Sequence, residues 1–323
     1  MLDKLVGLKE ATSNTPLIKL QHEKVNLYSK LEFCNMFGNI KARPALFILM
    51  EAIRKGEVNQ DTVIVESSSG NFALSLASIC QYLGLKFIAV IDPNINSMYE
   101  KILRIMCHQV VKVTERDDTG GYLLTRLNQV HEICDHIENS YWTNQYSNPN
   151  NFWAHYHGLG VEITQQIEKL DYVFIGVSSG GTISGLSRRL KESFPKIKII
   201  AVDSVGSVIF SEKSKKRYIP GIGSSIRPEI LKEAVIDEVI HVPEINTVNA
   251  CRSLLEQHAI FAGGSSGSCY AAINTYFSDM ELVGEKKNVL FICPDAGWAY
   301  SDTIYNPKWV EEKYVFETNV SLV

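Results

Sequence analysis

The sequence predicts an α/β protein built from parallel β-sheets with crossover helices. Short apolar runs of strand length alternate along the chain with longer segments whose apolar residues recur at helical spacing. Loops rich in glycine and serine follow several of the predicted strands. Such alternation is typical of parallel sheets, in which ligands bind beyond the carboxyl ends of the strands. We therefore expect these loops to line one site.

The first half of the chain is predicted to alternate strands with helices. Its first strand alternates apolar and polar residues, and the others are short apolar runs. Pro44 suits a first helical turn, where its missing N–H is no loss. The predicted strands are Val25–Glu32, Thr62–Glu66, Lys86–Asp92 and Val110–Thr114, and the predicted helices are Pro44–Val58, Phe72–Leu83, Ser97–His108 and Tyr122–Ile137.

The second half continues the alternation after a boundary that we place near Asn148-Pro149. It holds a helical stretch at Asn148–Ile167 and two glycine-rich loops that lead into helices, Ser178–Thr182 and Phe261–Gly267. At 323 residues the chain is long enough for two α/β domains that share a cleft. The predicted strands are Tyr172–Val177, Ile197–Val202, Glu238–Val242 and Asn288–Cys293, and further helices begin at Ile183, at Thr247 and after Gly267.

Composition argues against several classes of function. Hydrophobic residues make up 45% and charged residues 21% of the chain, as in ordinary globular proteins. The formal net charge of −4 argues against a general nucleic-acid binder. We expect the one dense basic run (Lys213, Lys215, Lys216 and Arg217) to be a solvated loop. No apolar run reaches membrane-spanning length, and the first residues lack the apolar core of a secretory signal.

Cysteine and histidine usage predicts reduced thiols and no structural metal. Seven cysteines are scattered without a C-x-x-C pair, which is typical of a cytoplasmic protein. His155 and His157 are two positions apart and would share a helix face poorly as metal ligands. We therefore expect a cytoplasmic protein that binds neither a metal nor a membrane.

The stretch Phe37–Ala45 places Lys41 between a glycine-containing turn and the start of a helix. A lysine at a helix start is most often a surface cation. A lysine whose stem lies among apolar neighbours can instead lose its proton and act as a nucleophile or base. The loops downstream favour this second interpretation.

Ser178–Thr182, here called the phosphate loop, has the features of a phosphate-binding site. Its glycines let backbone N–H groups approach an anion, its hydroxyls add donors, and the following helix points its positive end at the site. The loop is neither a Walker A motif nor the dinucleotide-binding G-x-G-x-x-G. Other glycine-rich turns between a strand and a helix share this composition, so the alternative is a purely structural turn.

Ser67–Asn71, here called the carboxylate loop, also lies at the start of a helix. Serine and asparagine are favoured helix caps, so capping is the alternative interpretation. Three serines exceed what one cap requires, and we expect the loop to bind a substrate carboxylate. A lysine, a phosphate loop and hydroxyl-rich loops together predict pyridoxal 5′-phosphate as the cofactor.

Five ordered motifs resemble those of the cysteine synthase and cystathionine β-synthase family, pyridoxal-phosphate enzymes of fold type II with a tryptophan synthase β-like fold. The resemblance extends from about Thr15 to Tyr300. It implies a homodimer of two-domain subunits with the cofactor in the cleft, the smaller domain at 38–147 and the larger at 1–37 and 148–323. The motifs are Asn35-x-x-Gly38-x-x-Lys41-x-Arg43-Pro44, Glu66-Ser67-Ser68-Ser69-Gly70-Asn71, Gly176-Val177-Ser178-Ser179-Gly180-Gly181-Thr182, Gly221-Ile222-Gly223 and Gly263-Gly264-Ser265-Ser266-Gly267.

The resemblance implies a role for each of several residues. Lys41 would form the Schiff base and remove the substrate α-proton, Asn71 would hold the 3′-oxygen, and Ser265 would face the pyridine nitrogen. The implied reaction is β-replacement, in which an activated serine loses its leaving group to give an aminoacrylate and a nucleophile then adds. A hydroxyl beside the ring nitrogen limits the electron sink and favours β-elimination over transamination. The implied phosphate ligands are Ser178, Ser179, Gly180, Gly181 and Thr182, and the implied substrate contacts are Ser67, Ser68, Ser69, Gly70, Asn71 and Gly221.

Three positions depart from the family pattern. The family has serine and aspartate where this chain has Asn39 and Ala42, and it has proline where this chain has Ser67. If the aspartate stabilises the lysine turn in the family, Ala42 implies a more mobile turn or an altered rate here.

Further stretches resemble those members of the family that join O-phospho-L-serine to L-glutamate, on the way to 2,3-diaminopropionate for siderophores and peptide antibiotics. By this resemblance Arg126 would bind an anionic group of either amino-acid substrate, and Tyr146 would line the pocket. A helical arginine is usually solvated and a tyrosine can belong to the core, so these alternatives stay open. The stretches are 120–126, 144–146, 155–158 and 206–210.

Two other functions remain open at this point. A cysteine synthase would combine O-acetylserine or O-phosphoserine with sulfide and would need no second carboxylate pocket. A non-catalytic module would keep the fold and regulate a partner protein. An assay of glutamate against sulfide as acceptor separates the two enzymes, and cofactor absorbance with substrate turnover separates enzyme from module.

Overall fold

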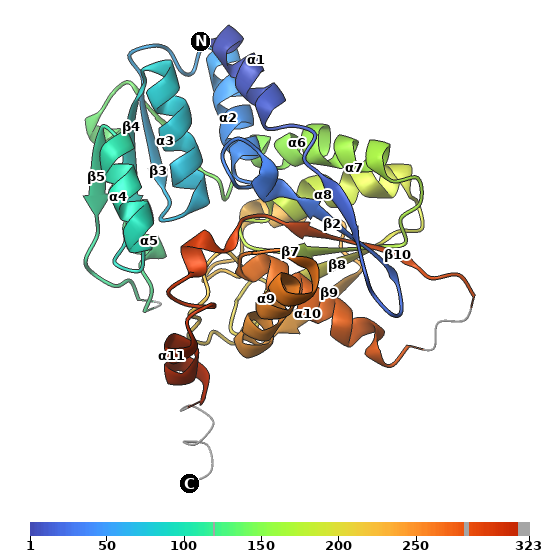
Figure 1. Cartoon of the computed structure of the whole chain (residues 1–323). Helices are drawn as coiled ribbons and strands as arrows, with labels where there is room; N and C mark the ends of the chain where they lie inside the picture. The colour runs from blue at the N-terminus through green and yellow to red at the C-terminus, as the bar shows by residue number, and fades with distance from the viewer. Residues whose placement is uncertain (119, 281–283, 316–323) are drawn as a thin grey trace.

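Two β-sheets organise the part of the chain that the structure, a computed structural model, describes: residues 1–118, 120–280 and 284–315 (Figure 1). The larger sheet has the strand order β1-β2-β10-β7-β8-β9, and the smaller has the order β5-β4-β3-β6. The strands are β1 (Leu17–Leu20), β2 (Asn26–Leu31), β3 (Val63–Ser67), β4 (Lys86–Ile91), β5 (Gln109–Lys112), β6 (Ser140–Trp142), β7 (Tyr172–Gly176), β8 (Lys198–Ser204), β9 (Glu238–Val242) and β10 (Asn288–Cys293).

The described strand pairs are parallel except for β1 with β2. The connection between β1 and β2 is too short for the crossover that a parallel pair requires, so these two strands run antiparallel. The predicted α/β class with parallel sheets is confirmed.

Helices cover both faces of each sheet. The α-helices are α1 (Leu2–Ala11), α2 (Ala42–Arg54), α3 (Asn71–Leu83), α4 (Ser97–Met106), α5 (Leu123–His136), α6 (Asn150–Ala154), α7 (Gly160–Gln166), α8 (Gly181–Ser193), α9 (Glu244–His258), α10 (Gly264–Ser278) and α11 (Pro307–Val310). Shorter turns are the 3-10 helices η1 (Glu32–Cys34), η3 (Glu229–Glu233) and η4 (Gly297–Tyr300) and the π-helical turns η2 (His155–Leu159) and η5 (Glu311–Val315). None of the described helices is long and apolar enough to cross a membrane.

Apolar clusters on the two faces of each sheet form the core. On the smaller sheet, one cluster packs α1 to α4 against β3 and β4, and Val65 and Val90 pack against α5 on the other face. On the larger sheet, Phe174 and Phe291 face α9 and α10, whereas Val173 of the same strand β7 faces α7 and α8. Alternate residues of one strand therefore serve opposite faces, as the pleat requires.

The stretch predicted to be helical over Asn148–Ile167 is helical in the structure and consists of α6, the π-helical turn η2 and α7. Gly185 of α8 packs directly on this turn, since a Cβ at Gly185 would lie 2.7 Å from the backbone nitrogen of Tyr156. The loop expected over Phe261–Gly267 ends at Gly263, and the residues after it form the first turn of α10.

The small residues at the start of α10 are needed for close packing. A Cβ at Gly267 would lie 2.6 Å from the carbonyl oxygen of Thr247 in α9, and a Cβ at Gly264 would lie 2.4 Å from Ile219. Glycine here lets two helices approach closely, although its local preference is for loops.

The two sheets come from largely separate stretches of chain. The smaller sheet uses strands between residues 63 and 142, and the larger uses β1 and β2 with strands between 172 and 293. In Figure 1 the smaller sheet with α3, α4 and α5 lies at the left, and α2 lies between it and the rest of the molecule. The domain limits at 38–147, 1–37 and 148–323 stay a prediction.

Candidate active site

The predicted site residues meet where strands of both sheets end. The Nζ atom of Lys41 lies 3.3 Å from the hydroxyl of Ser179 in the phosphate loop after β7. The side chain of Asn71, from the carboxylate loop after β3, donates a hydrogen bond of 2.7 Å to Asp295 after β10. The structure thus brings together residues more than 200 positions apart, as the parallel-sheet rule predicts.

Asn35 and Asn39 hold the turn that presents Lys41. The Oδ1 atom of Asn39 accepts hydrogen bonds from the backbone N–H of Lys41 at 2.9 Å and from the hydroxyl of Ser75 at 3.2 Å. The amide of Asn35 donates to the Asn39 carbonyl at 2.8 Å. Ala42 is fully buried and has no side-chain acceptor. The side chain of Asn39 therefore supplies the acceptor that fixes the backbone of this turn.

Arg43 anchors the same segment to the larger sheet. Its guanidinium donates to Glu32 at 2.5 Å and to Glu162 of α7 at 2.7 Å, and Lys30 pairs with Glu162 at 3.0 Å. All of these side chains are buried. Burial raises the pKa of Glu162, but hydrogen bonds and charges from Arg43 and Lys30 outweigh it and lower the value to about 2. The network therefore keeps Glu162 ionised and fixes the helix start behind Lys41.

Lys41 lies in an environment that favours the neutral amine. Burial lowers the pKa of the Lys41 amine to about 8, and the negative charge of Asp295 opposes this shift. A buried lysine with a lowered pKa is a competent nucleophile and base near neutral pH.

Asp295 is a functional residue that sequence reasoning missed. It is buried, and its Oδ2 atom accepts hydrogen bonds from Asn71 at 2.7 Å and from the hydroxyl of Tyr300 at 3.1 Å. Burial raises the pKa of its carboxyl to about 6. The Oδ1 atom has no hydrogen-bond partner among the described residues and abuts Gly263, where a Cβ would lie 2.1 Å away. Its position directly after a buried strand was the signal available in the sequence.

Asp295 and Tyr99 orient the amide of Asn71. The hydroxyl of Tyr99 donates to the Asn71 Oδ1 atom at 2.8 Å, while the Asn71 NH₂ group faces Asp295. One N–H of the amide is then left to donate to a ligand.

The phosphate loop has the backbone geometry of an anion site. Gly180 has a φ of 86°, and a Cβ at Gly181 would lie 2.1 Å from the side-chain oxygen of Asn151. The 13-residue helix α8 begins at Gly181 and directs its free N–H groups at this position. Thr182 lies 3.3 Å from His155, whose pKa burial and the charges of Lys41 and Arg43 lower well below its usual value. This histidine is therefore neutral.

The serines of the carboxylate loop differ in their hydrogen bonds, and not all of them cap helix α3. The Ser68 hydroxyl accepts the backbone N–H of Ala73 at 3.3 Å, which is a capping role for α3. The Ser67 hydroxyl is buried with no hydrogen-bond partner among the described residues. The alternative that these serines only cap the helix therefore accounts for Ser68 but not for Ser67.

Arg126 lies against this loop and is not a solvated helix residue. Its Nη1 atom donates to the Ser69 hydroxyl at 3.1 Å, and its Nε atom lies 3.2 Å from Asp92 in an ion pair without hydrogen-bond alignment. Its side chain is 12% exposed. Arg126 is thus placed where an anionic ligand group could reach it, with Asp92 as a competing partner.

Ser265 and Gly221 belong to the larger-sheet part of the chain, near the end of β7 and beside Tyr300. Ser265 is buried in the first turn of α10, and a Cβ at Gly176 of β7 would lie 3.3 Å from the Ser265 Cβ. Gly221 has a φ of 90°, and a Cβ there would lie 3.1 Å from the hydroxyl of Tyr300. The hydroxyl of Tyr300 in turn donates to Asp295 at 3.1 Å, so Gly221 lies close to the Asn71–Asp295 pair.

The basic run expected to be a solvated loop is only partly solvated. Lys213, Lys215 and Lys216 are exposed, but Arg217 is half-buried and donates to the carbonyl of Ile222 at 2.9 Å. The prediction was wrong for Arg217, because a loop later in the chain covers it.

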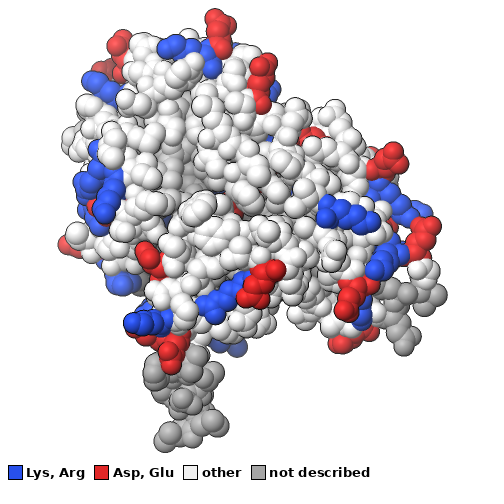
Figure 2. Space-filling model, viewed as in Figure 1, with Lys and Arg blue, Asp and Glu red and all other residues white. Residues whose placement is uncertain are grey.

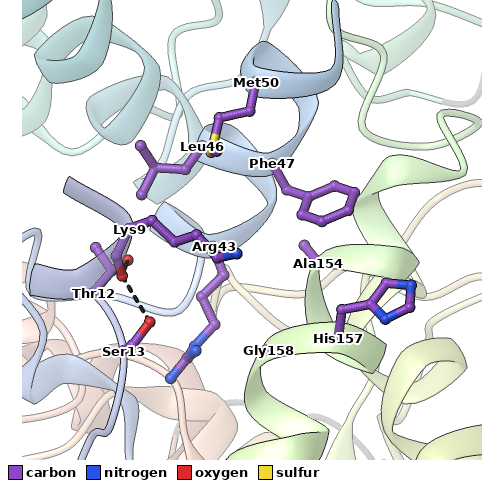
Figure 3. A pocket seen from close by; sticks show the side chains of 10 residues that line it. All are labelled: Lys9, Thr12, Ser13, Arg43, Leu46, Phe47, Met50, Ala154, His157 and Gly158. Atoms are coloured by element: carbon purple, nitrogen blue, oxygen red, sulfur yellow. Dashed lines mark hydrogen bonds between the residues drawn. The ribbon is translucent and has the colours of Figure 1, made fainter. Parts of the chain in front are cut away.

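A separate hollow lies behind Arg43 and holds none of the other predicted site residues (Figure 3). Residues of α1, α2, α6 and η2 line it, and the rings of Phe47 and His157 stack with their centroids 6.3 Å apart. On the face shown in Figure 2, charges of both signs are interspersed over the surface. Neither feature offers the acid–base groups that converge at Lys41. Among the described residues, no group of three or more His, Cys, Asp or Glu side chains is placed to hold a metal ion.

The chain is similar to known proteins over almost its whole length. The model of a family described as pyridoxal-phosphate dependent enzymes matches residues 8–295. A curated N-(2-amino-2-carboxyethyl)-L-glutamate synthase from Cupriavidus metallidurans is 40% identical over 306 residues, which cover 93% of this chain and 90% of that protein.

Solved structures show the same fold. An O-acetylserine dependent cystathionine β-synthase from Helicobacter pylori is 27% identical with a TM-score of 0.84, over 93% of this chain and 98% of that chain. A hydrogen sulfide-producing enzyme from Fusobacterium nucleatum is 26% identical with a TM-score of 0.83, over 91% of this chain and 98% of that chain. The expected fold type II architecture is confirmed.

Proposed function

Since this chain belongs to the family of pyridoxal-phosphate dependent enzymes, we propose that it joins O-phospho-L-serine to L-glutamate by β-replacement, giving N-(2-amino-2-carboxyethyl)-L-glutamate. The observation that carries the proposal is the 40% identity to a synthase of that name over almost the whole chain. The placement of Arg126 beside the carboxylate loop supports an anionic substrate.

The residues present fit the cofactor. Lys41 would carry it, Asn71 would donate to its 3′-oxygen, and Ser265 would face its ring nitrogen. Ser178–Thr182 would hold the phosphate. A Cβ at Gly181 would clash with Asn151, so only glycine fits at that position of the loop. When bound, pyridoxal phosphate withdraws electrons from the substrate α-carbon and makes its proton acidic.

The protein's own groups then decide the outcome. The amine of Lys41, with a pKa of about 8, is suited to accept the α-proton. The Ser67–Asn71 loop binds the substrate carboxylate at the N-terminus of α3, where free N–H groups stabilise negative charge. The two substrates together bring a phosphate and three carboxylates, so a site that accepts glutamate needs more cationic donors than one that accepts sulfide.

A cysteine synthase activity is the second candidate. It is favoured by the solved structures of an O-acetylserine dependent enzyme and of a hydrogen sulfide-producing enzyme with the same fold. Sulfide carries no carboxylate, so this activity would leave Arg126 without an acceptor group to bind.

The test is an acceptor screen with the purified holoenzyme. O-phospho-L-serine and O-acetyl-L-serine are each supplied with glutamate or sulfide, and products are identified by mass spectrometry. We expect the phosphoserine–glutamate pair to be used best. Cysteine as the main product would replace this proposal with a cysteine synthase, and no turnover with bound cofactor would favour a regulatory module.

Three finer proposals rest on the family resemblance. We propose a homodimer, a cytoplasmic location and a role in supplying 2,3-diaminopropionate for siderophores. Light scattering on the purified protein measures the first, and a monomer at micromolar concentration would contradict it. Fractionation of cells tests the second, and the product profile of a deletion strain tests the third.

A further inference from the structure

The side chain of Arg217 packs against the loop Gly221–Gly223. Its Nη1 atom donates to the Ile222 carbonyl at 2.9 Å. A Cβ at Gly223, whose φ is 74°, would lie 2.5 Å from the same nitrogen. Any residue other than glycine at position 223 would therefore displace the guanidinium.

This position is adjacent to the site. The backbone N–H of Gly223 donates to Val177 at 2.8 Å, and the Ser178 hydroxyl donates to Gly223 at 3.2 Å, so the loop over Arg217 is bonded to the phosphate loop. Tyr146 interacts electrostatically with both Arg126 and Arg217. Tyr146 therefore lies near two guanidinium groups from separate parts of the sequence.

Arg217 has no ion-pair partner among the residues that the structure describes, whereas Arg126 pairs with Asp92 and Arg43 with two glutamates. Asp203 and Glu244 are the acidic groups whose charges act on Arg217, and neither forms an ion pair with it among the described residues. The Oδ1 atom of Asp203 accepts the backbone N–H of Ser204 at 2.8 Å, and its Oδ2 atom lies 4.0 Å from the Nε2 atom of His241. Glu244 accepts the backbone N–H groups of Tyr218 and Ile219 at 2.8 to 3.0 Å.

An arginine held half-buried without a counter-ion is costly unless a ligand supplies one. Burial lowers the pKa of the Arg217 guanidinium more than the charges of Asp203 and Glu244 raise it, although the group stays charged. Its remaining N–H donors suit a planar carboxylate, which guanidinium binds with two parallel hydrogen bonds.

We propose that Arg217 binds a carboxylate of the acceptor substrate, and that the acceptor is therefore a dicarboxylic amino acid. The proposal rests on the proposed function and deepens it. The carboxylate loop serves the donor amino acid, and Arg126 is partly neutralised by Asp92. Arg217 is the cation left for the additional carboxylate that glutamate brings.

The experiment compares Arg217→Gln with Lys213→Gln, an exposed cation from the same basic run. In Arg217→Gln we expect the KM for glutamate to rise by about 10- to 100-fold, the usual effect of losing one charged hydrogen-bond partner. The KM for O-phospho-L-serine and the rate with sulfide should stay as in the wild type. Lys213→Gln should leave all constants unchanged, and the melting temperature of both variants checks folding.

Calorimetry supplies a readout that does not depend on turnover. Glutamate should bind the wild-type holoenzyme more tightly than glutamine, and Arg217→Gln should abolish that preference. An unchanged KM for glutamate overturns the inference, as does a loss that falls on phosphoserine or on cofactor affinity instead. If the wild type does not use glutamate, the proposed function fails, and the preference for glutamate over glutamine in binding still decides the role of Arg217.

Discussion

The lysine side of the site and the acceptor side differ in how far their polar groups are satisfied by the protein itself. On the lysine side, Asn39 fixes the backbone of Lys41, and the guanidinium of Arg43 donates hydrogen bonds to Glu32 and Glu162. On the acceptor side, Arg217 has no ion pair among the described residues.

The polar groups of the lysine side are already held in place by the protein, whereas those of the acceptor side remain free to bind a ligand. The lysine side is complete without a substrate, as suits cofactor chemistry that needs one fixed geometry. The acceptor side keeps donors free, and an anionic substrate that satisfies them gains specificity over one that leaves them unpaired. Changes on the first side should affect cofactor binding and stability, and changes on the second should affect substrate choice.

The largest effect is expected at Lys41. Lys41→Ala removes the amine that carries the cofactor, so the visible absorbance of the covalently bound cofactor should be lost completely. Absorbance spectra before and after borohydride treatment measure it. A cofactor linkage to the protein that is still reducible by borohydride would show that another residue carries it.

Arg43→Met should destabilise the protein strongly. It leaves two buried carboxylates without their main partner, and breaking a buried pair in this way costs about 3–5 kcal/mol. Urea unfolding gives the difference. Arg54→Met is the matched control, because Arg54 pairs with Glu51 at the exposed end of the same helix and should cost no more than about 0.5 kcal/mol. Similar losses for the two variants would mean that the network does not anchor the helix.

Arg126→Ala should weaken the use of phosphoserine, glutamate or both by about 10- to 100-fold while cofactor absorbance is retained. The reason is loss of a cation held beside the carboxylate loop. Kinetics with each substrate varied separately assign the effect. Constants like those of the wild type for both substrates would leave Arg126 a structural partner of Asp92.

The smallest predicted effect is on pH dependence. Loading of cofactor onto the apoprotein requires the neutral amine of Lys41, so its rate should rise with a midpoint near pH 8, where an ordinary lysine would give about 10.4. At that pH the carboxyl of Asp295, with a pKa of about 6, is ionised and favours the protonated amine. Asp295→Asn removes this charge and should move the midpoint to lower pH. Stopped-flow absorbance measures the midpoint pH for the wild type and for Asp295→Asn. A higher midpoint in the variant would contradict the electrostatic interaction between Asp295 and Lys41.

The sequence predicted the strands and the ends at which the site forms, because buried strands are read from apolar runs and glycine-rich loops follow them. It missed β1 and β6, which have four and three residues and carry too little pattern. It misread the start of α10, since glycine and serine favour loops locally and only packing on α9 makes them helical.

The sequence predicted those site residues that lie in local motifs and missed those that depend on contacts between distant parts of the chain. Lys41, Asn71 and the phosphate loop follow from local motifs. The bond between Asn71 and Asp295 spans 224 positions, and the burial of Arg217 depends on the glycine loop above it, so neither has a local signal.

The most direct test of the contrast between the two sides is a competition assay. Holoenzyme with O-phospho-L-serine receives glutamate and sulfide together, and the ratio of the two products is measured for the wild type and for Arg217→Gln. We predict that the wild type forms mainly the glutamate adduct, and that the variant shifts towards cysteine by at least about 10-fold while keeping its cofactor absorbance. An unchanged product ratio, or an equal loss of both products, would contradict the assignment of acceptor choice to this side of the site.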